Sequence, residues 1–384
     1  MSSTSNNVLD QFSKKFKTTP RLFFAPGRIN LIGEHVDYND GYVMPAAIDK
    51  GIWFAVAPNN TDTAHFISVD LNEELSIPLT DIHPMDGWKN YVLGILDQVQ
   101  IKDLPLHGFD CAFGGNVPFG GGLSSSAAVE CGLLFALNEI FEFHLQRTAI
   151  ANMAQKAEHT YPGVKCGIMD MFASMMGKMD QVILLNCLTL DYKYLPINLA
   201  EYSIILINTK VHHSLAGSEY NLRRQECAEG FKILQSLLPG VKSFQDIKPA
   251  DVEAHKGQLA EKIYMRCLYV TQEIERTLKA AAHLEKDELK EFGKLMFETH
   301  EGLSKLYNVS CPELDFLVDQ AKKHSAIIGS RVMGGGFGGC TINLIRKEEW
   351  ATITEEITTA YKNQFNIDAE VYDIAIGDGT YEAL

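Results

Sequence analysis

The sequence predicts an α+β protein with mixed sheets in two lobes, and three observations support this prediction. Residues 21–80 have the apolar patterns of β-strands, whereas residues 218–325 are mostly helical in periodicity. The composition changes near residues 195–215. The chain of 384 residues also exceeds one typical hydrophobic core. We therefore expect two domains, at residues 1–200 and 201–384, with the last residues packing back on the first.

The first half of the chain alternates predicted helices and strands. A short docking helix at the N-terminus is indicated by apolar residues at helical spacing, namely Val8, Leu9, Phe12 and Phe16. Apolar runs predict strands at residues 52–57, 65–71, 109–113, 182–190 and 203–208, and helical periodicity predicts helices at 88–99, 125–142 and 146–160. The strand at 65–71 is expected to pair with the strand at 52–57 as a hairpin.

The second half begins with helices and ends with strands around a glycine cluster. Ser310 is predicted to cap a helix, because Pro312 and Glu313 follow it in the pattern of a first helical turn. Strands are predicted at 326–333 and 341–345. The Gly334–Gly339 segment between them formally matches a dinucleotide fingerprint, but it leads into a strand rather than a helix. We therefore predict a loop whose backbone approaches a ligand closely. A hairpin turn that binds no ligand is the alternative.

Composition excludes several classes of protein. The net charge of −15, from 49 acidic and 34 basic side chains, argues against binding to nucleic acid or to an anionic membrane. No apolar run reaches transmembrane length, and no targeting signal is evident. The eight cysteines are scattered without metal-ligand spacing, which is typical of a reducing compartment. We expect a cytoplasmic protein that acts as a monomer.

The most informative segment is the Gly120–Ser126 loop, with the sequence GGGLSSS directly before a helix. Glycines allow close approach of a ligand to the backbone, and the unpaired amides and dipole of a helix N-terminus favour an anion such as phosphate. A glycine turn with a serine cap is the alternative. Neither a Walker loop nor the protein-kinase motifs occur in the sequence.

A second segment, APGRINLIGEHVDY, concentrates ionisable residues around turn glycines at Arg28, Glu34, His35 and Asp37. Carboxylates and an imidazole suit a ligand rich in hydroxyl groups, since each hydroxyl both donates and accepts hydrogen bonds. The alternative is a solvated loop with local salt bridges.

Two further carboxylates lie in apolar surroundings. Asp170 lies in a methionine-rich helix, where a carboxylate is costly unless it is paired or opens into a cleft, so it is a candidate catalytic base. Glu158 lies twelve residues upstream and could hold a metal ion such as Mg²⁺, which takes few protein oxygens. A capping or surface role for Asp170, and a solvated helix position for Glu158, are the alternatives.

Together these segments resemble the three motifs of the GHMP small-molecule kinases, and GRINLIGEHVDY resembles the galactokinase branch of that family. The resemblance extends from about residue 21 to residue 345. It implies an N-terminal lobe with a left-handed β-α-β unit, a ferredoxin-like C-terminal lobe, and a site between them.

The resemblance also implies roles for residues at matched positions. Asp170 would be the base, and Arg28 would stabilise charge between the sugar C1 hydroxyl and the phosphates. The sugar would be bound by Glu34, His35, Asp37, Gly167, Asp170 and Tyr220. The ATP phosphates would lie on Gly120, Gly121, Gly122, Leu123, Ser124, Ser125 and Ser126, with Ser68, Trp88 and Tyr91 near the rest of the nucleotide. Mg²⁺ would be held by Ser126 and Glu158.

Three positions depart from the family pattern. Val36 replaces a usual threonine, Met171 replaces a common glutamine, and Met333 stands where threonine is typical. Met333 removes a hydroxyl next to the Gly334–Gly339 segment, which affects the polar contacts expected of that loop.

The implied reaction is ATP-dependent phosphorylation of α-D-galactose at C1, the first committed step of galactose breakdown. Phosphoryl transfer requires mainly alignment and charge neutralisation, which these residue types can supply. A kinase for N-acetylgalactosamine or arabinose would carry the same motifs. A non-catalytic sensor of galactose and ATP is the rival of a different class, although it would need only the binding contacts and not the base.

Overall fold

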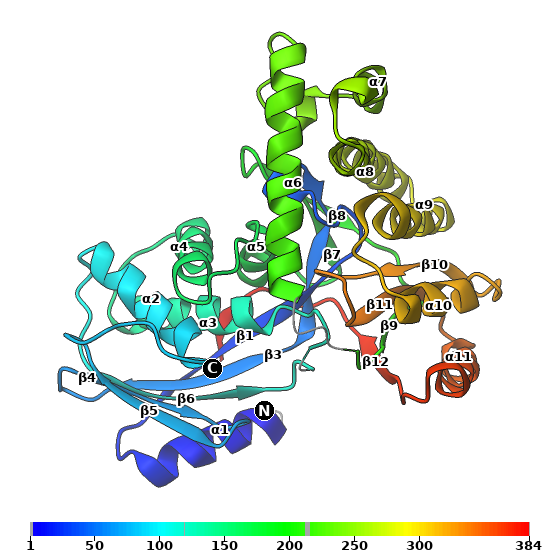
Figure 1. Cartoon of the computed structure of the whole chain (residues 1–384). Helices are drawn as coiled ribbons and strands as arrows, with labels where there is room; N and C mark the ends of the chain where they lie inside the picture. The colour runs from blue at the N-terminus through cyan, green and yellow to red at the C-terminus, as the bar shows by residue number, and fades with distance from the viewer. Residues whose placement is uncertain (1–2, 119, 212–215, 384) are drawn as a thin grey trace.

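A computed structural model describes residues 3–118, 120–211 and 216–383, which form two lobes side by side (Figure 1). The first lobe contains a six-stranded sheet with the order β13-β1-β3-β6-β4-β5. Its strands are β1 (Arg21–Asn30), β3 (Pro45–Pro58), β4 (Thr63–Ser68), β5 (Glu73–Pro78), β6 (Phe109–Gly115) and β13 (Tyr381–Ala383). β4 and β6 run parallel, whereas the other neighbouring pairs are antiparallel. The α+β class is confirmed.

The predicted hairpin between residues 52–57 and 65–71 is wrong. β3 pairs with β1 and β6, and β4 pairs with β5 and β6. A strand pattern shows which face of a strand is buried but does not identify its neighbour, so the pairing could not be read from the pattern.

Helices cover both faces of this sheet (Figure 1). α1 (Ser3–Lys15) packs on one face through Val8 and Phe12, which confirms the predicted docking helix. The other face carries α2 (Lys89–Ile101), α3 (Ser125–Ile140), α4 (Arg147–Thr160) and α5 (Met169–Met176). α3 is largely buried because it is apolar on most of its circumference, which makes it a rigid support for the loop before it.

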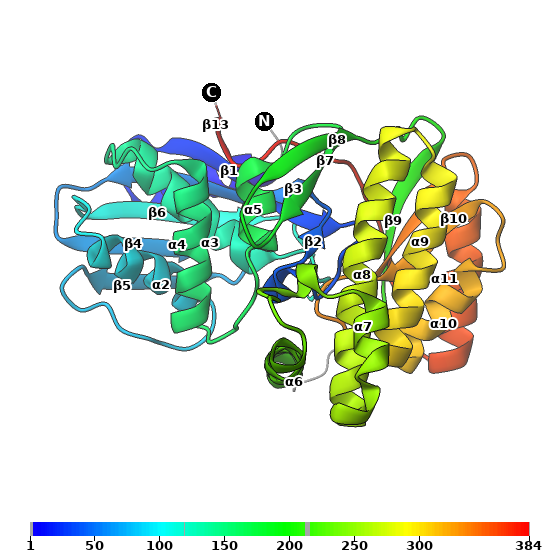
Figure 2. The same cartoon turned by 90° about the horizontal axis from the view of Figure 1, so that it is seen from above.

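A small sheet lies between the lobes, next to α5 and α8 (Figure 2). Its strands are β2 (Tyr42–Val43), β7 (Gln181–Asn186) and β8 (Tyr192–Pro196). The predicted strand at 182–190 ends early, at Asn186. The Asn186 side chain accepts hydrogen bonds from the amides of Leu188 and Thr189, and this turn reverses the chain.

The second lobe contains an antiparallel sheet with the order β10-β11-β9-β12, which is the ferredoxin-like order. Its strands are β9 (Tyr202–Asn208), β10 (Ile327–Val332), β11 (Cys340–Arg346) and β12 (Glu370–Ile374). The helices of this half are α6 (Ala216–Leu237), α7 (Pro249–Ala254), α8 (Glu261–Glu285), α9 (Leu289–Gly302), α10 (Pro312–Ala321) and α11 (Trp350–Phe365). Short helical turns are η1 (Asp37–Asn39), η2 (Phe244–Asp246), η3 (Lys256–Gln258) and η4 (Leu303–Tyr307).

The start of α10 differs by one residue from the prediction. Cys311 occupies the N-cap position, and the Ser310 hydroxyl instead donates to the Asp315 carboxylate at 2.6 Å. Within the described ranges, no helix is long and apolar enough to cross a membrane.

We propose a domain boundary at residues 200/201, as the sequence predicts. β9 is the first strand of the second sheet and begins at Tyr202. The chain then returns to the first lobe at its end, because β13 pairs with β1.

Candidate active site

A cavity between the two lobes is lined by the predicted catalytic and metal-binding residues and by most of the predicted sugar-binding residues. Among the described residues, Gly167 and residues 120–125 of the glycine-serine loop are outside this lining. The space inside it is about 570 Å³, which includes the solvent at its open mouth. Residues from β1, the loop after β1, α3 to α6 and the loop after β10 line it. They include Arg28, Glu34, His35, Asp37, Ser126, Glu158, Asp170, Tyr220, Gly334 and Gly335.

Arg28 and Asp170 form a bidentate ion pair at the cavity. Nε and Nη2 of Arg28 lie 2.7 and 2.8 Å from the two carboxylate oxygens of Asp170. Burial alone would lower the pKa of Arg28, but the charges of Asp170 and Glu34 outweigh burial and raise it. Asp170 lies in the first turn of α5, where the helix dipole also favours a carboxylate. The pair therefore compensates the charge of Arg28 in a largely buried position.

The Gly120–Ser126 loop lies against this pair. Nη1 of Arg28 donates to the Gly122 carbonyl at 2.5 Å, and the Arg28 amide donates to the Leu123 carbonyl at 3.1 Å. Ser124 occupies the N-cap position of α3, yet its side chain does not cap the helix. Its hydroxyl donates instead to Oδ2 of Asp170. The simple serine-cap interpretation is therefore wrong, and the first amides of α3 keep their capacity to bind an anion.

Glu34 is buried and charged. Its Oε2 accepts a hydrogen bond from Nη1 of Arg331 at 2.8 Å and another from the Gly334 amide at 3.0 Å. Burial alone would raise the pKa of Glu34, but the charges of Arg331 and Arg28 reverse this effect and lower it. The solvated-loop alternative for this segment is therefore wrong.

His35 is held by protein groups on both ring nitrogens. Nε2 lies 3.2 Å from the Gly335 carbonyl, and Nδ1 lies 2.7 Å from the Tyr38 hydroxyl. Because a carbonyl can only accept, Nε2 carries the proton of the neutral ring and Nδ1 accepts from Tyr38. Burial is the main cause that lowers the pKa of His35 to about 4, so the ring is neutral near pH 7. Its backbone is left-handed, with φ of 60°, a conformation that is uncommon outside glycine.

Asp37 lines the same cavity, and no cation among the described residues forms an ion pair with it. Burial, followed by the charges of Asp170 and Glu34, raises the pKa of Asp37 to about 7. Gly167 packs directly on this carboxylate, since a Cβ at residue 167 would lie 2.1 Å from Oδ2 of Asp37. Tyr220 from α6 lines the cavity, with its ring centroid 5.4 Å from that of His35.

Glu158 and Ser126 meet at one end of the cavity. Burial is the main cause that raises the pKa of Glu158 to about 7, while hydrogen bonds with Glu130 and Ser126 lower it. Among the described residues, Oε2 of Glu158 is buried and accepts no hydrogen bond. Unpartnered oxygen ligands of this kind fit a hard cation such as Mg²⁺.

The residues predicted near the rest of the nucleotide lie outside the cavity lining. Ser68 ends β4, opposite Glu73 of β5 and Phe113 of β6. Trp88 contacts the two residues opposite Ser68, since its Nε1 donates to Glu73 at 2.8 Å and its ring packs on Phe113. Tyr91 follows on α2, and its pKa is raised to about 12 by burial and by the charges of Glu158 and Glu130.

Sequence reasoning missed several residues that organise the cavity. Arg331, Tyr38 and Glu130 were given no role, although each contacts a predicted site residue. The one sequence signal that could have indicated Arg331 is that a buried carboxylate such as Glu34 requires a cationic partner. No local pattern could supply it, since the two residues are 297 positions apart.

The three departures from the family pattern are buried. Val36 is fully buried, and Met171 and Met333 are each 1% exposed. The Met333 amide donates to the Cys340 carbonyl at 3.0 Å, and this hydrogen bond closes the hairpin around the Gly334–Gly339 segment. The hydroxyl absent at Met333 is thus replaced by an apolar side chain within the core.

Comparison with known proteins agrees with this fold. Residues 10–58 match the galactokinase galactose-binding signature. Residues 90–178 match the N-terminal domain of GHMP kinases, and residues 279–363 match their C-terminal domain. A crystal structure of mevalonate kinase, at 20% identity and with a TM-score of 0.64, shares the fold over 93% of this chain and 99% of its own. The two lobes and the cavity between them thus define a kinase of the GHMP class.

More similar proteins narrow this class. The galactokinase of Thermotoga petrophila is 39% identical over 92% of this chain and 98% of its own. The galactokinase of Bacillus subtilis is also 39% identical, over 94% of both chains. The structure of Lactococcus lactis galactokinase complexed with galactose matches with a TM-score of 0.94 at 31% identity, over 98% of this chain and 99% of that chain. The chain belongs to the galactokinase family.

Proposed function

We propose that this kinase transfers the γ-phosphoryl group of ATP to the C1 hydroxyl of α-D-galactose, giving galactose 1-phosphate and ADP as the first committed step of galactose breakdown. The observation that carries the proposal is the Arg28–Asp170 pair, which lies in one cavity with Glu34, His35 and Asp37 and touches the Gly120–Ser126 loop. A base, a fixed positive charge, hydroxyl-binding groups and an anion site are thereby adjacent.

Asp170 is suited to accept the hydroxyl proton. Its Oδ2 accepts hydrogen bonds from Arg28 and Ser124, while its Oδ1 accepts from Arg28. A carboxylate has about four lone-pair positions, so Oδ1 keeps one for the sugar hydroxyl. As the sugar oxygen bonds to the γ-phosphorus and the bond to the leaving ADP breaks, the hydroxyl proton passes to Asp170. The ion pair holds the carboxylate in position for this transfer.

Arg28 supplies the fixed positive charge. Its guanidinium fork is held by Asp170 and the Gly122 carbonyl, so it needs no reorganisation when negative charge develops on the transferred group. The amides at the start of α3 would bind the phosphates. Ser68, Trp88 and Tyr91 lie on the elements that we assign to the rest of the nucleotide.

Ser126 and Glu158 would hold Mg²⁺. Within the described ranges, no three His, Cys, Asp or Glu side chains form a group that could hold a metal ion by themselves. This composition fits an ion that takes most of its ligands from substrate phosphates and water. When bound, the ion would neutralise phosphate charge during transfer.

Sugar recognition would fall to Glu34, His35, Asp37, Gly167 and Tyr220. Both nitrogens of His35 already have protein partners, so a sugar hydroxyl would bind there by replacing Tyr38 or the Gly335 carbonyl. Gly167 would act by leaving room for the Asp37 carboxylate.

The test is phosphate transfer from Mg-ATP to galactose, N-acetylgalactosamine and arabinose, followed by ³¹P NMR of the product. We expect ADP release that depends on galactose, with an anomeric phosphate as product. Preference for another of these sugars would overturn the substrate, and no ADP above background with any of them would overturn the reaction.

A further inference from the structure

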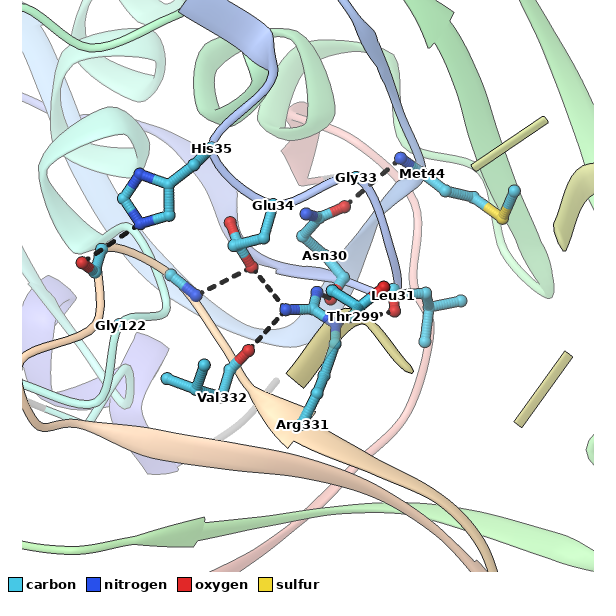
Figure 3. Close-up of polar contacts among 12 residues, drawn as sticks. Asn30, Leu31, Gly33, Glu34, His35, Met44, Gly122, Thr299, Arg331 and Val332 are labelled. Carbon is cyan, nitrogen blue, oxygen red and sulfur yellow. Dashed lines mark hydrogen bonds and ion pairs between the residues drawn. The ribbon is translucent and has the colours of Figure 1, made fainter. Parts of the chain in front are cut away.

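Arg331 is the largest fully buried side chain of the described residues, and it lies on β10 in the second lobe. Figure 3 shows its guanidinium group pointing toward the loop that carries Glu34. Nε donates to the Leu31 carbonyl at 2.9 Å, and Nη2 donates to the Asn30 carbonyl. Nη1 donates to Oε2 of Glu34 at 2.8 Å and to the Val332 carbonyl. One side chain of the second lobe therefore donates hydrogen bonds to three residues of the first lobe, namely Asn30, Leu31 and Glu34.

The contacts fix the orientation of the Glu34 carboxylate. Both hydrogen bonds that the described residues make to this carboxylate end on Oε2, from Arg331 and from the Gly334 amide. Oε1 accepts no hydrogen bond from the described residues, and Glu34 lines the cavity. A carboxylate held at one oxygen by a bound cation presents the other in a defined direction, which is the geometry needed to select one hydroxyl of a sugar.

The same contacts hold the start of the Gly334–Gly339 segment in position. Gly334 and Gly335 follow Arg331 by three and four residues and line the cavity. A Cβ added at Gly334 would lie 3.3 Å from the Gly122 carbonyl oxygen, so this segment lies between Glu34 and the Gly120–Ser126 loop. Displacing Arg331 would therefore move a wall of the cavity as well as Glu34.

We propose that Arg331 is a positioning residue for sugar recognition, which acts by holding Glu34 with Oε1 directed at one sugar hydroxyl. The inference rests on the proposed function, since it assumes that the cavity binds a hexose. Arg331 itself is buried behind Glu34 and does not line the cavity. It is therefore a different kind of residue from Arg28, which faces the reacting groups.

The test uses Arg331→Lys, which keeps the positive charge but loses the fork, and Arg331→Gln, which keeps hydrogen-bond donors without the charge. Calorimetry would measure the Kd of galactose and of its 2-, 3-, 4- and 6-deoxy analogues. Galactose binding should weaken by about 10- to 100-fold, the usual effect of losing a hydrogen bond to a charged group. The analogue that lacks the hydroxyl bound by Glu34 should lose no further affinity in the variants, whereas the other analogues should weaken as galactose does.

Arg21→Lys is the control, because Arg21 also forms a two-point ion pair, with both carboxylate oxygens of Glu382 at 2.7 Å, but lies at the start of β1 and outside the cavity lining. It should leave the galactose Kd within about twofold of the wild type, the size of effect expected away from the site. The proposal is overturned if the Arg331 variants bind galactose as the wild type does, if all five sugars weaken by the same factor, or if neither variant folds. Wild-type protein that binds none of the sugars would instead contradict the proposed function.

Discussion

The two sides of the cavity differ in how far protein contacts already occupy them. We propose that one side binds the sugar and the other the phosphates. The proposed sugar side, comprising Glu34, His35 and Asp37, is buried, and the polar atoms of Glu34 and His35 are held by residues of the second lobe and of η1. The phosphate side, comprising Gly120–Ser126, is exposed at Gly120 and half-buried at its serines. Its N-cap serine bonds to Asp170 rather than to the helix.

This difference indicates two modes of recognition. The sugar side is organised by the protein before a ligand arrives, which favours selectivity among hydroxyl patterns. The phosphate side leaves helix amides for an anion to complete. Substitutions on the phosphate side and at the ion pair should therefore mainly lower kcat or affinity for ATP, and substitutions on the sugar side should mainly raise KM for the sugar.

The largest effect is expected from Asp170→Asn. Asparagine keeps the shape of the side chain but cannot take the hydroxyl proton, so kcat should fall by about 10²- to 10⁴-fold. Nucleotide affinity should change little, whereas the melting temperature should fall because the largely buried Arg28 loses its charged partner. A kcat within tenfold of the wild type in a steady-state ADP-release assay would remove Asp170 from the base role.

Arg28→Lys should have the next largest effect. Lysine supplies a point charge in place of a fork that bonds to Asp170 and Gly122 together, so kcat should fall by about 10²- to 10³-fold. The expected signature in steady-state kinetics is a loss in kcat that exceeds any rise in KM for galactose. A change confined to KM would assign Arg28 to the sugar side.

Ser124→Ala should be milder, because it removes one hydrogen bond to the charged Asp170. We expect kcat to fall by about tenfold or more, with galactose affinity unchanged. Ser125→Ala is the matched control, since Ser125 begins α3 in the same loop and should affect mainly KM for ATP. Equal effects of the two substitutions on kcat would contradict the assigned role of Ser124.

The smallest effect concerns the pH dependence of stability through Asp37. Its pKa of about 7 lies above the ordinary value, so between pH 5 and 7 the folded protein keeps a proton that the unfolded chain has released. This contribution to stability is present at low pH and is lost as pH rises through 7, by at most about 1.4 kcal/mol per pH unit. His35, with its lowered pKa, acts in the opposite direction.

Asp37→Asn removes the contribution of the Asp37 carboxylate to the pH dependence of stability and leaves the opposing contribution of His35 in place. The free energy of unfolding, measured by urea titration without ligand, should fall less steeply between pH 5 and 7 in the variant than in the wild type. Parallel pH profiles for the two proteins would show that Asp37 is not buried in the way described.

The elements of this fold were largely predictable, whereas the pairing of distant residues was not. The docking helix α1 and most strands of the two large sheets follow from apolar spacing that the chain carries locally, whereas β12 and β13 were not predicted. The partner of Glu34 does not, because Arg331 joins it only when β10 of the second lobe meets the loop after β1. The hydroxyl of Ser124 likewise points away from its local helix to Asp170, 46 residues onward.

Residue types and spacing predict the chemistry of three motifs, whereas only the resemblance to a known family implies that the motifs meet in one site between the lobes. Arg28, Ser124 and Asp170 belong to three separate segments, and each had an ordinary alternative in a cap, a salt bridge or a surface position. Only the fold shows that they contact one another.

The central claim is that one cavity holds the sugar and the terminal phosphate against the Arg28–Asp170 pair. A crystal structure of the chain with galactose and a non-hydrolysable ATP analogue tests it most directly. The account predicts the C1 hydroxyl within hydrogen-bond distance of Oδ1 of Asp170, with the phosphates on the Gly120–Ser126 loop. A hexose bound elsewhere, or phosphates remote from that loop, would contradict it.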